Sequence, residues 1–275
     1  MTQSVDFIFF DSGTGGLPYM LHLKKQNPHA RCVYLADTYN FPYGEKTSQE
    51  ITQSAFASLM LILERFTPKA IIISCNTLSV EALDFLRKRF PDILFVGTVP
   101  AIKTAASVSK NRRIGLLATN RTIQSAYTKK LITDFADDCT VIDRGDPELI
   151  SFIENSFFEA NKEETEQAVR PAIDFFRSKN ADTIVLGCTH FLHIVDLSIE
   201  LASPDIHIID SCAGVVNQAL RLVQIDEKNI DTKSFTYDQT FFITGCNKKD
   251  DTALQKHYEL IAHRLGLPYG GVLAR

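Results

Sequence analysis

The chain has 275 residues, of which 45% are hydrophobic and 23% are charged, and its formal net charge is −4. This length allows one large domain or two ordinary ones with a well-packed core. The small negative charge argues against nucleic acid as a main partner, because nucleic-acid-binding proteins carry a basic face. The first residues lack the features of a secretion signal, and no apolar run is long enough to cross a membrane, so we expect a cytoplasmic protein.

Short apolar runs alternate along the chain with longer amphipathic stretches. The runs predicted as strands are "FIFF" (7–10), "CVYLA" (32–36), "AIIIS" (70–74), "ILFVG" (93–97), "RIGLLA" (113–118), "TVID" (140–143), "TIVLG" (183–187), "IHIID" (206–210) and "FFITG" (241–245). Helical patterns between them include 48–66, 78–90 and 162–179, and Pro171 is expected to kink or divide the last. Apolar strands separated by helices predict an α/β fold with mainly parallel sheets covered on both faces.

The two halves of the chain share one layout. "DFIFFDSGTGG" and "RRIGLLATNRT" each read as a strand and a polar turn, and each precedes a later strand that ends in a cysteine. We therefore predict two similar doubly wound domains, related by a pseudo-twofold axis, with a ligand site in the cleft between them. Residues 1–97 with 212–275 form the first predicted domain, with Asp11 and Cys75. Residues 98–211 form the second, with Glu154, Cys188 and His190.

The six cysteines are scattered, without a CxxC pair or a short cluster with histidine. This spacing disfavours zinc, and without a secretion signal the thiols are expected to be free. Most free buried cysteines are inert core residues. Cys75 in "IIISCNTLSV" and Cys188 in "TIVLGCTHFL" differ, because each ends a strand and precedes a predicted helix. A helix N-terminus favours the thiolate and can hold a carboxylate, so the pair suggests two acid/base groups on opposite sides of a substrate.

Other polar residues lie near strand ends. "DSGTGG" matches neither a phosphate loop nor GxGxxG, so Asp11 either caps a tight turn or serves in ammonium binding or proton transfer. Asp37 precedes Pro42-Tyr43-Gly44, which reads as a plain turn. His190 could tune the Cys188 thiol, although a lone histidine is more often structural. Glu154 could equally lie on a solvated helix face.

Several segments together resemble the glutamate racemases, within the aspartate/glutamate racemase superfamily. They are "FFDSGTGG", "ADTYNFPYG", "SCNTLS", "IGLLATNRTIQSAY", "DPELISFIE" and "LGCTHF". The resemblance implies a cofactor-independent enzyme that interconverts L- and D-glutamate for bacterial cell-wall synthesis. It also implies two similar α/β domains with the site between them, and commonly a homodimer.

The resemblance assigns roles residue by residue. Cys75 and Cys188 match the two catalytic cysteines, of which one removes the α-proton and the other delivers a proton to the opposite face. Asp11 and His190 match residues that assist these thiols, and Glu154 matches a further acidic residue near the second. The matching substrate-contacting pairs are Asp11-Ser12, Tyr43-Gly44, Asn76-Thr77 and Thr189-His190.

Two departures from the family pattern concern pocket shape. Leu78 replaces the usual alanine, and Phe191-Leu192 replaces the usual Tyr-Pro pair. Both changes alter apolar bulk beside catalytic segments and leave the two thiols in place.

Racemisation without pyridoxal phosphate requires other stabilisation of the deprotonated α-carbon. The sequence offers no persuasive phosphate cradle, so no cofactor is expected. Backbone N–H groups with Asn76, Thr77 and Thr189 are the candidate donors. The alternatives are an aspartate or other amino-acid racemase, a non-catalytic two-lobed small-molecule binding protein, and a dithiol redox protein.

Overall fold

The computed structural model describes residues 2–225, 237–245 and 251–273. The chain divides into two compact units, which are described separately. Unit 1 comprises Met1–Thr98 with Cys212–Arg275, and unit 2 comprises Val99–Ser211.

The sheet of unit 1 has parallel strands in the order β10-β9-β2-β1-β3-β4. Residues Val5 to Asp11 of β1 are all buried, because helices cover both faces of the sheet. This confirms the α/β prediction for unit 1. The strands are β1 (Gln3–Asp11), β2 (Cys32–Ala36), β3 (Phe66–Ile73), β4 (Leu94–Gly97), β9 (Thr240–Ile243) and β10 (Tyr269–Val272).

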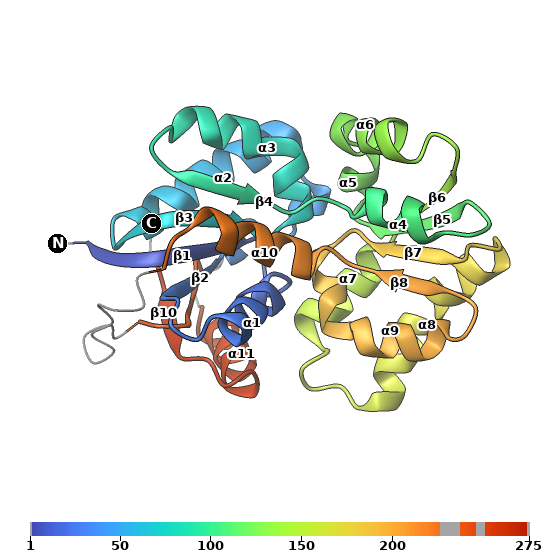
Figure 1. Cartoon of the computed structure of the whole chain (residues 1–275). Coiled ribbons are helices and arrows are strands. Elements are labelled where there is room, and N and C mark those ends of the chain that lie inside the picture. Colours follow the sequence, from blue (N-terminus) through green and yellow to red (C-terminus); the bar gives the residue numbers. More distant parts are fainter. Residues whose placement is uncertain (1, 226–236, 246–250, 274–275) are drawn as a thin grey trace. The chain divides into compact units, whose positions relative to one another are not determined.

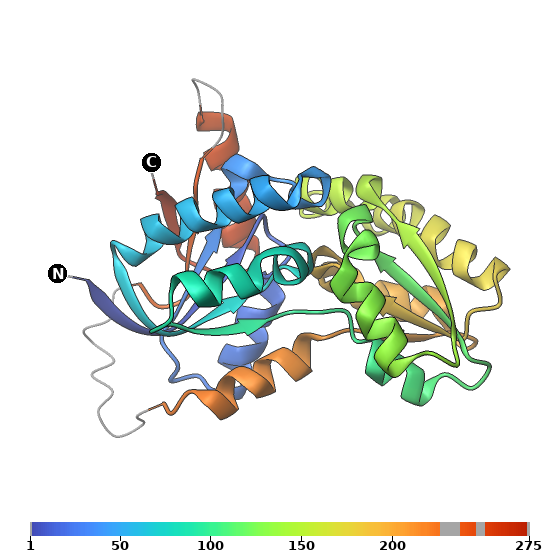
Figure 2. The same cartoon turned by 90° about the horizontal axis from the view of Figure 1, so that it is seen from above.

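Helices α2 (Ser48–Leu63) and α3 (Asn76–Arg89) lie side by side over one face of this sheet (Figures 1 and 2). Helices α1 (Leu17–Gln26) and α11 (Thr252–Arg264) lie below the opposite face in Figure 1, and α10 (Cys212–Leu222) contacts α1. Leu59 of α2 and Leu86 of α3 belong to one buried apolar cluster with Ile71 of β3. Two single-turn 3₁₀ helices follow β2, namely η1 (Thr38–Asn40) and η2 (Tyr43–Glu45).

Unit 2 has a smaller parallel sheet in the order β6-β5-β7-β8. Helices α4 to α6 lie on one face and α7 to α9 on the other (Figure 1). The strands are β5 (Arg113–Ala118), β6 (Thr140–Gly145), β7 (Thr183–Leu186) and β8 (His207–Ile209). The helices are α4 (Ile102–Val108), α5 (Asn120–Gln124), α6 (Ala126–Phe135), α7 (Pro147–Asn155), α8 (Lys162–Ser178), η3 (Thr189–Ile194) and α9 (Val195–Ala202).

Two elements differ from the sequence-based expectations. Helix α8 is not divided at Pro171 but continues through it, because the buried stripe that includes Val169, Ile173 and Phe176 packs as one face. Strand β10 was not predicted, since Gly270 and Gly271 give it no apolar run. It is paired with β9, and the register shifts between Tyr269 and Gly271.

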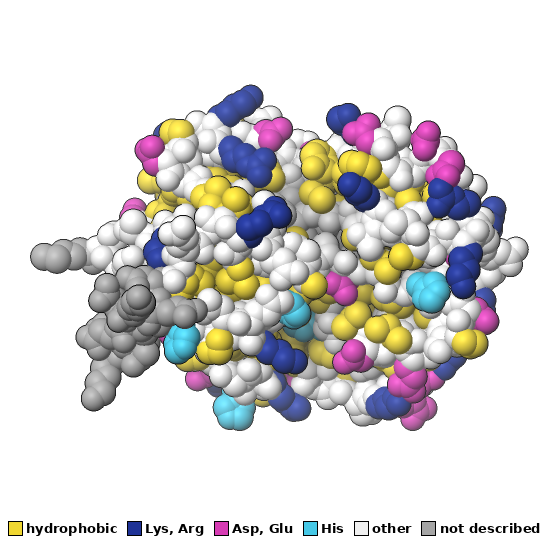
Figure 3. Space-filling view, in the orientation of Figure 1, with side chains coloured by type: hydrophobic (Ala, Val, Ile, Leu, Met, Phe, Trp, Pro, Cys, Tyr) yellow, Lys and Arg dark blue, Asp and Glu magenta, His cyan; other side chains and the backbone are white. Residues whose placement is uncertain are grey.

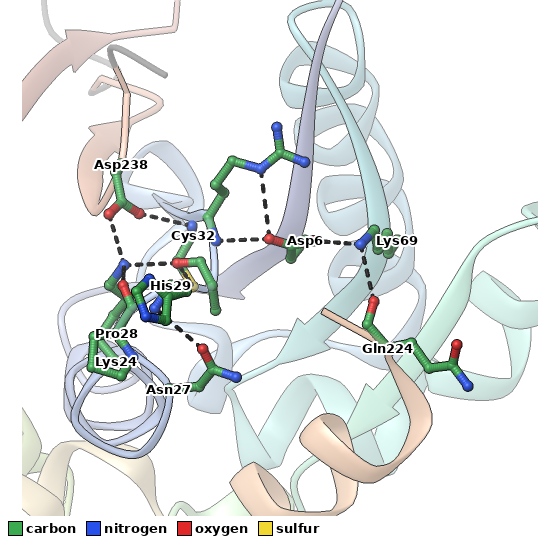
Figure 4. Close-up of polar contacts among 11 residues, drawn as sticks. Asp6, Lys24, Asn27, Pro28, His29, Cys32, Lys69, Gln224 and Asp238 are labelled. Atoms are coloured by element: carbon green, nitrogen blue, oxygen red, sulfur yellow. Dashed lines mark hydrogen bonds and ion pairs between the residues drawn. The ribbon is translucent and has the colours of Figure 1, made fainter. Parts of the chain in front are cut away.

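The amino end of the unit 1 sheet is closed by ion pairs (Figure 4). Asp6 is only 2% exposed, and its carboxylate lies 2.8 Å from Nζ of Lys69. Lys24 donates to Asp238 at 2.7 Å, and Asp238 accepts the backbone N–H of Cys32 at 3.1 Å. Burial raises the pKa of the Cys32 thiol well above its usual value, so this cysteine is protonated and inert.

The outer surface shows no single-sign region on the face drawn in Figure 3, where basic and acidic side chains are interspersed. Within the described ranges, no helix combines the length and the apolar character needed to cross a bilayer.

Gly115 in β5 tests how tightly α8 packs on the unit 2 sheet. An added Cβ would lie 2.5 Å from Cδ1 of Phe176, so Gly115→Ala is expected to lower the free energy of unfolding by about 1–3 kcal/mol. Gly214 is a matched control, because nothing lies within 4 Å of an added Cβ in this exposed turn of α10. Gly214→Ala should raise stability by roughly 0.5 kcal/mol. Equal urea midpoints for the two variants, measured by circular dichroism, would contradict the described packing.

Candidate active site

The first half-site lies at the carboxyl end of the unit 1 sheet. Asp11 ends β1, and Cys75 lies two residues beyond β3 as the N-cap residue of α3. Because Phe10 of β1 pairs with Ile73 of β3 in a parallel register, both strands end at the same edge of the sheet. Asp11 is fully buried and Cys75 is 5% exposed. The structure therefore brings the predicted carboxylate and the predicted thiol to one edge, with the first turn of a helix directly behind the thiol.

The glycine-rich turn after β1 packs against the residue that precedes Cys75. A Cβ on Gly16 would lie 2.3 Å from Oγ and 2.7 Å from Cβ of Ser74, so only glycine allows this approach. Tyr34 holds the turn, since its hydroxyl donates to the carbonyl of Gly13 at 2.8 Å and accepts from the N–H of Gly16 at 3.0 Å. Ser12 donates its backbone N–H to Oδ1 of Asp11 at 2.6 Å. The turn thus fixes the Asp11 carboxylate at the strand end.

Asn76 and Thr77 form the start of α3 and are 2% and 3% exposed. Neither polar atom of the Asn76 side-chain amide has a hydrogen-bond partner among the residues that the structure describes. Buried polar side chains in native proteins are nearly always satisfied, so an unpartnered amide is expected where a ligand supplies the partner. This amide directly follows the candidate thiol.

Tyr43 is held at the same edge of the sheet by Asp37, which directly follows β2. The Tyr43 hydroxyl donates to Oδ2 of Asp37 at 2.5 Å. Burial raises the pKa of Tyr43 well above its usual value, and the charges of Asp37, Cys75 and Asp11 raise it further. Tyr43 therefore keeps its proton. Gly44 follows in η2 and is partly exposed. The sequence alone gave Asp37 no role, because its partners are not recognisable from a turn pattern.

The second half-site lies at the carboxyl end of the unit 2 sheet. Cys188 follows β7 by two residues and is 6% exposed, while Thr189 and His190 are 2% and 3% exposed in η3. The helix expected after this thiol is a short 3₁₀ helix that leads into α9, not an α-helix. The support of a long helix N-terminus is consequently available to Cys75 and not to Cys188.

Three buried side chains, Cys188, His190 and Glu154, form a polar line that connects the end of β7 to α7. Nδ1 of His190 lies 3.7 Å from Sγ of Cys188, and Nε2 of His190 lies 2.9 Å from Oε2 of Glu154. Glu154 is 1% exposed, so the alternative of a solvated helix face is wrong. Burial opposes the charged form of His190, but hydrogen bonds to Cys188 and Glu154 outweigh it and raise the pKa well above the usual value. The arrangement is an imidazolium between the Cys188 thiol and the Glu154 carboxylate.

Two further cysteines lie at the amino ends of strands, away from these half-sites, since Cys32 begins β2 and Cys139 directly precedes β6. Within the described part of the chain no cysteine is in a disulfide bond, and Cys246 lies outside the described residues. In the part of the chain that the structure describes, no three His, Cys, Asp or Glu side chains are grouped so that they could hold a metal ion.

Replacement of Glu154 by glutamine tests the polar line. Since the carboxylate raises the pKa of His190, Glu154→Gln is expected to lower that pKa. A histidine with a raised folded pKa adds stability that is fully present below its unfolded pKa and is lost as the pH rises through the folded pKa. In the variant this loss should occur at lower pH than in the wild-type protein. NMR titration of the His190 ring, assigned with His190→Asn, measures the shift, and an unchanged pKa would contradict the described contact.

Comparisons with known proteins identify the family of the chain. The profile of the family described as Asp/Glu/Hydantoin racemase matches residues 21–219. The chain is 34% identical over 271 residues to a glutamate racemase of Treponema pallidum, covering 98% of this chain and 97% of the relative. It is 37% identical over 214 residues to a glutamate racemase of Herpetosiphon aurantiacus, covering 78% of this chain and 83% of the relative.

Solved structures show the same fold over the whole chain. A crystal structure of Escherichia coli glutamate racemase, in complex with L-glutamate and the activator UDP-MurNAc-Ala, superposes with a TM-score of 0.81 at 28% identity. It covers 100% of this chain and 99% of its own. A glutamate racemase isoform of Bacillus anthracis superposes with a TM-score of 0.77 at 25% identity, covering 98% and 97% of the two chains. The profile match and the extent of these likenesses show that the chain belongs to the Asp/Glu/hydantoin racemase family.

Proposed function

We propose that this chain is a glutamate racemase that uses two cysteines as opposing acid/base groups and needs no cofactor. The relatives that match most of the chain are glutamate racemases, which supports glutamate as the substrate. The observation that carries the two-base proposal is the buried line Cys188–His190–Glu154. A cysteine that only fills space has no need of a buried imidazolium and carboxylate, whereas a thiol that must ionise does.

The proposed mechanism places both half-sites on one glutamate. In one direction, a thiolate takes the α-proton, so that the Cα–H bond breaks and an S–H bond forms. The second thiol then delivers its proton to the opposite face of the α-carbon and becomes the thiolate. The reverse reaction starts from this second state, so the two thiols exchange roles. By analogy with the family, Cys75 serves D-glutamate and Cys188 serves L-glutamate.

Neighbouring residues stabilise the charges of this cycle. Negative charge that develops on the substrate carboxylate is stabilised by N–H groups of the first turn of α3 and by Asn76, Thr77 and Thr189. Asp11 holds the substrate ammonium group or assists Cys75. His190 stabilises the Cys188 thiolate, and Glu154 holds His190 in its charged form.

The resemblance also supports a cellular role. We propose that the D-glutamate formed enters peptidoglycan synthesis in the cytoplasm, and that the enzyme acts as a homodimer. Size-exclusion chromatography with light scattering of the purified chain tests the dimer, and a single species with the mass of one chain would contradict it.

A polarimetric assay without added cofactor tests the proposed activity. The purified protein should racemise L- and D-glutamate and leave both enantiomers of aspartate unchanged at equal enzyme concentration. Turnover of aspartate alone would move the proposal to an aspartate racemase with the same thiols. No turnover of any of the four would contradict it.

Single cysteine substitutions test the two-base role. Cys75→Ser and Cys188→Ser should each lower kcat/KM more than about 100-fold, because a serine hydroxyl is far too weak an acid to replace either thiol. Cys139→Ser is the matched control, since Cys139 is a free and only partly buried thiol of unit 2 beside Asp138. It should keep wild-type activity. Full activity of either Cys75→Ser or Cys188→Ser would refute the mechanism.

Asn76 should contribute to function at the expense of stability. Asn76→Leu removes a buried amide without a partner among the described residues, so it is expected to raise the free energy of unfolding by about 1 kcal/mol. The same change should lower kcat/KM roughly 10- to 100-fold if the amide binds substrate. Ser58 is the control, because its buried hydroxyl also has no partner among the described residues. Ser58→Ala should keep full activity, and an active Asn76→Leu enzyme would contradict the assignment.

A further inference from the structure

Asp37 is a fully buried carboxylate that collects hydrogen bonds from several side chains. Oδ2 accepts from the Tyr43 hydroxyl at 2.5 Å, and Oδ1 accepts from the Thr244 hydroxyl at 2.8 Å. Nδ2 of Asn40 lies 3.0 and 2.9 Å from the two oxygens. Every one of these partners donates, so the carboxylate accepts hydrogen bonds on both of its oxygens.

Thr244 reaches this carboxylate from the far end of the sequence. It follows β9 directly, is 4% exposed, and lies 207 residues beyond Asp37. Its hydroxyl accepts the backbone N–H of Tyr39 at 3.0 Å while it donates to Asp37. The neighbouring carbonyl of Gly245 accepts from the Thr38 hydroxyl at 2.8 Å. Thr244 and Gly245, which follow β9, thus form hydrogen bonds both to the start of the loop 37–45 and to the Asp37 carboxylate. Asn40 and Tyr43 of the same loop donate to this carboxylate as well.

We infer that Thr244 is a positioning residue that sets the Tyr43-Gly44 segment through Asp37. The inference rests on the proposed function in one respect, because Tyr43-Gly44 is there a substrate-contacting pair. The side chain at position 244 must accept one hydrogen bond and donate another at the same time. Among small side chains, the hydroxyls of threonine and serine can do both. Valine has nearly the same shape but leaves the Tyr39 N–H and one Asp37 oxygen without this partner.

The geometry also says which kinetic parameter should change. The backbone of Asp37 is hydrogen-bonded to the sheet edge that carries Asp11 and Cys75, since its N–H donates to the carbonyl of Asp11 at 2.8 Å. Loss of the Thr244 hydroxyl therefore loosens the loop side of Asp37 and leaves Asp11 and Cys75 on their strand ends. A loosened substrate contact weakens ground-state and transition-state binding alike, which raises KM and leaves kcat unchanged.

The experiment compares Thr244→Val, Thr244→Ser and Thr240→Val in two assays. Thr240 is the matched control, because it is a threonine of the same strand, is 3% exposed, and lies outside the Asp37 contacts. Hydrogen exchange of the peptide 38–45, measured by mass spectrometry without ligand, reports the loop directly. We expect at least a roughly tenfold faster exchange in Thr244→Val, with Thr244→Ser and Thr240→Val close to the wild-type protein.

The second assay is steady-state racemisation in both directions. Thr244→Val is expected to raise KM about tenfold for each enantiomer with kcat nearly unchanged, and Thr244→Ser should restore wild-type values. Because L- and D-glutamate are equally stable, kcat/KM must fall equally in both directions, which checks the data internally. A fall in kcat alone, or equal effects of serine and valine, would overturn the inference.

The two assays separate failure of the inference from failure of the proposed function. A wild-type protein that racemises nothing defeats the proposed function, while the exchange of peptide 38–45 still decides whether Thr244 sets the loop. An active enzyme whose loop exchange is the same in Thr244→Val and the wild-type protein defeats the inference alone. If Thr244→Val does not fold, Asn40→Ala takes its place, since it removes other donors from the same carboxylate and should give the same KM effect and faster exchange.

Discussion

Burial of charged groups at the ends of parallel strands is the constraint on which the candidate site depends. Asp11, Asp37, Glu154 and His190 are all nearly inaccessible to water, and an unpaired charge in such a place is strongly destabilising. The hydrogen bonds of Asp37, Glu154 and His190 therefore hold each of these side chains in a defined geometry. The strand ends supply the positions, and the buried polar contacts hold the side chains there.

The two half-sites support their thiols by different means. Cys75 is the N-cap residue of a 14-residue helix, so its thiolate is favoured by the oriented N–H groups of the first turn. Cys188 precedes a 3₁₀ helix of six residues and has instead a charged imidazole beside it. In the proposed mechanism each thiol serves as base in one direction and as acid in the other, so both environments must support a thiolate. The internal likeness of the two halves thus does not extend to the chemistry around each thiol.

Much of the fold follows from local sequence, whereas the contacts of the site do not. The nine predicted strands are present. In strands such as β2 and β9, burial on both faces leaves an uninterrupted apolar run, whereas β10 escaped detection because glycines replace that run. The positions of Asp11, Cys75 and Cys188 at strand ends were predictable for the same reason. The contact between Glu154 and His190 was not, since the two residues lie 36 positions apart in the chain. The role of Asp37 could not be predicted either, because its partner Thr244 lies 207 residues further along the chain, at the end of the neighbouring strand β9, and local patterns carry no record of such contacts.

The central claim is that two separate groups exchange protons with opposite faces of one α-carbon. The most direct test is the initial rate of deuterium incorporation when L-glutamate is incubated with the enzyme in D₂O. The account predicts that newly formed D-glutamate carries deuterium at the α-carbon while the recovered L-glutamate retains its proton, because the thiol that delivers the proton has equilibrated with solvent. Equal deuterium in recovered L-glutamate and in product from the first turnovers would indicate a single base that serves both faces, and would contradict the account.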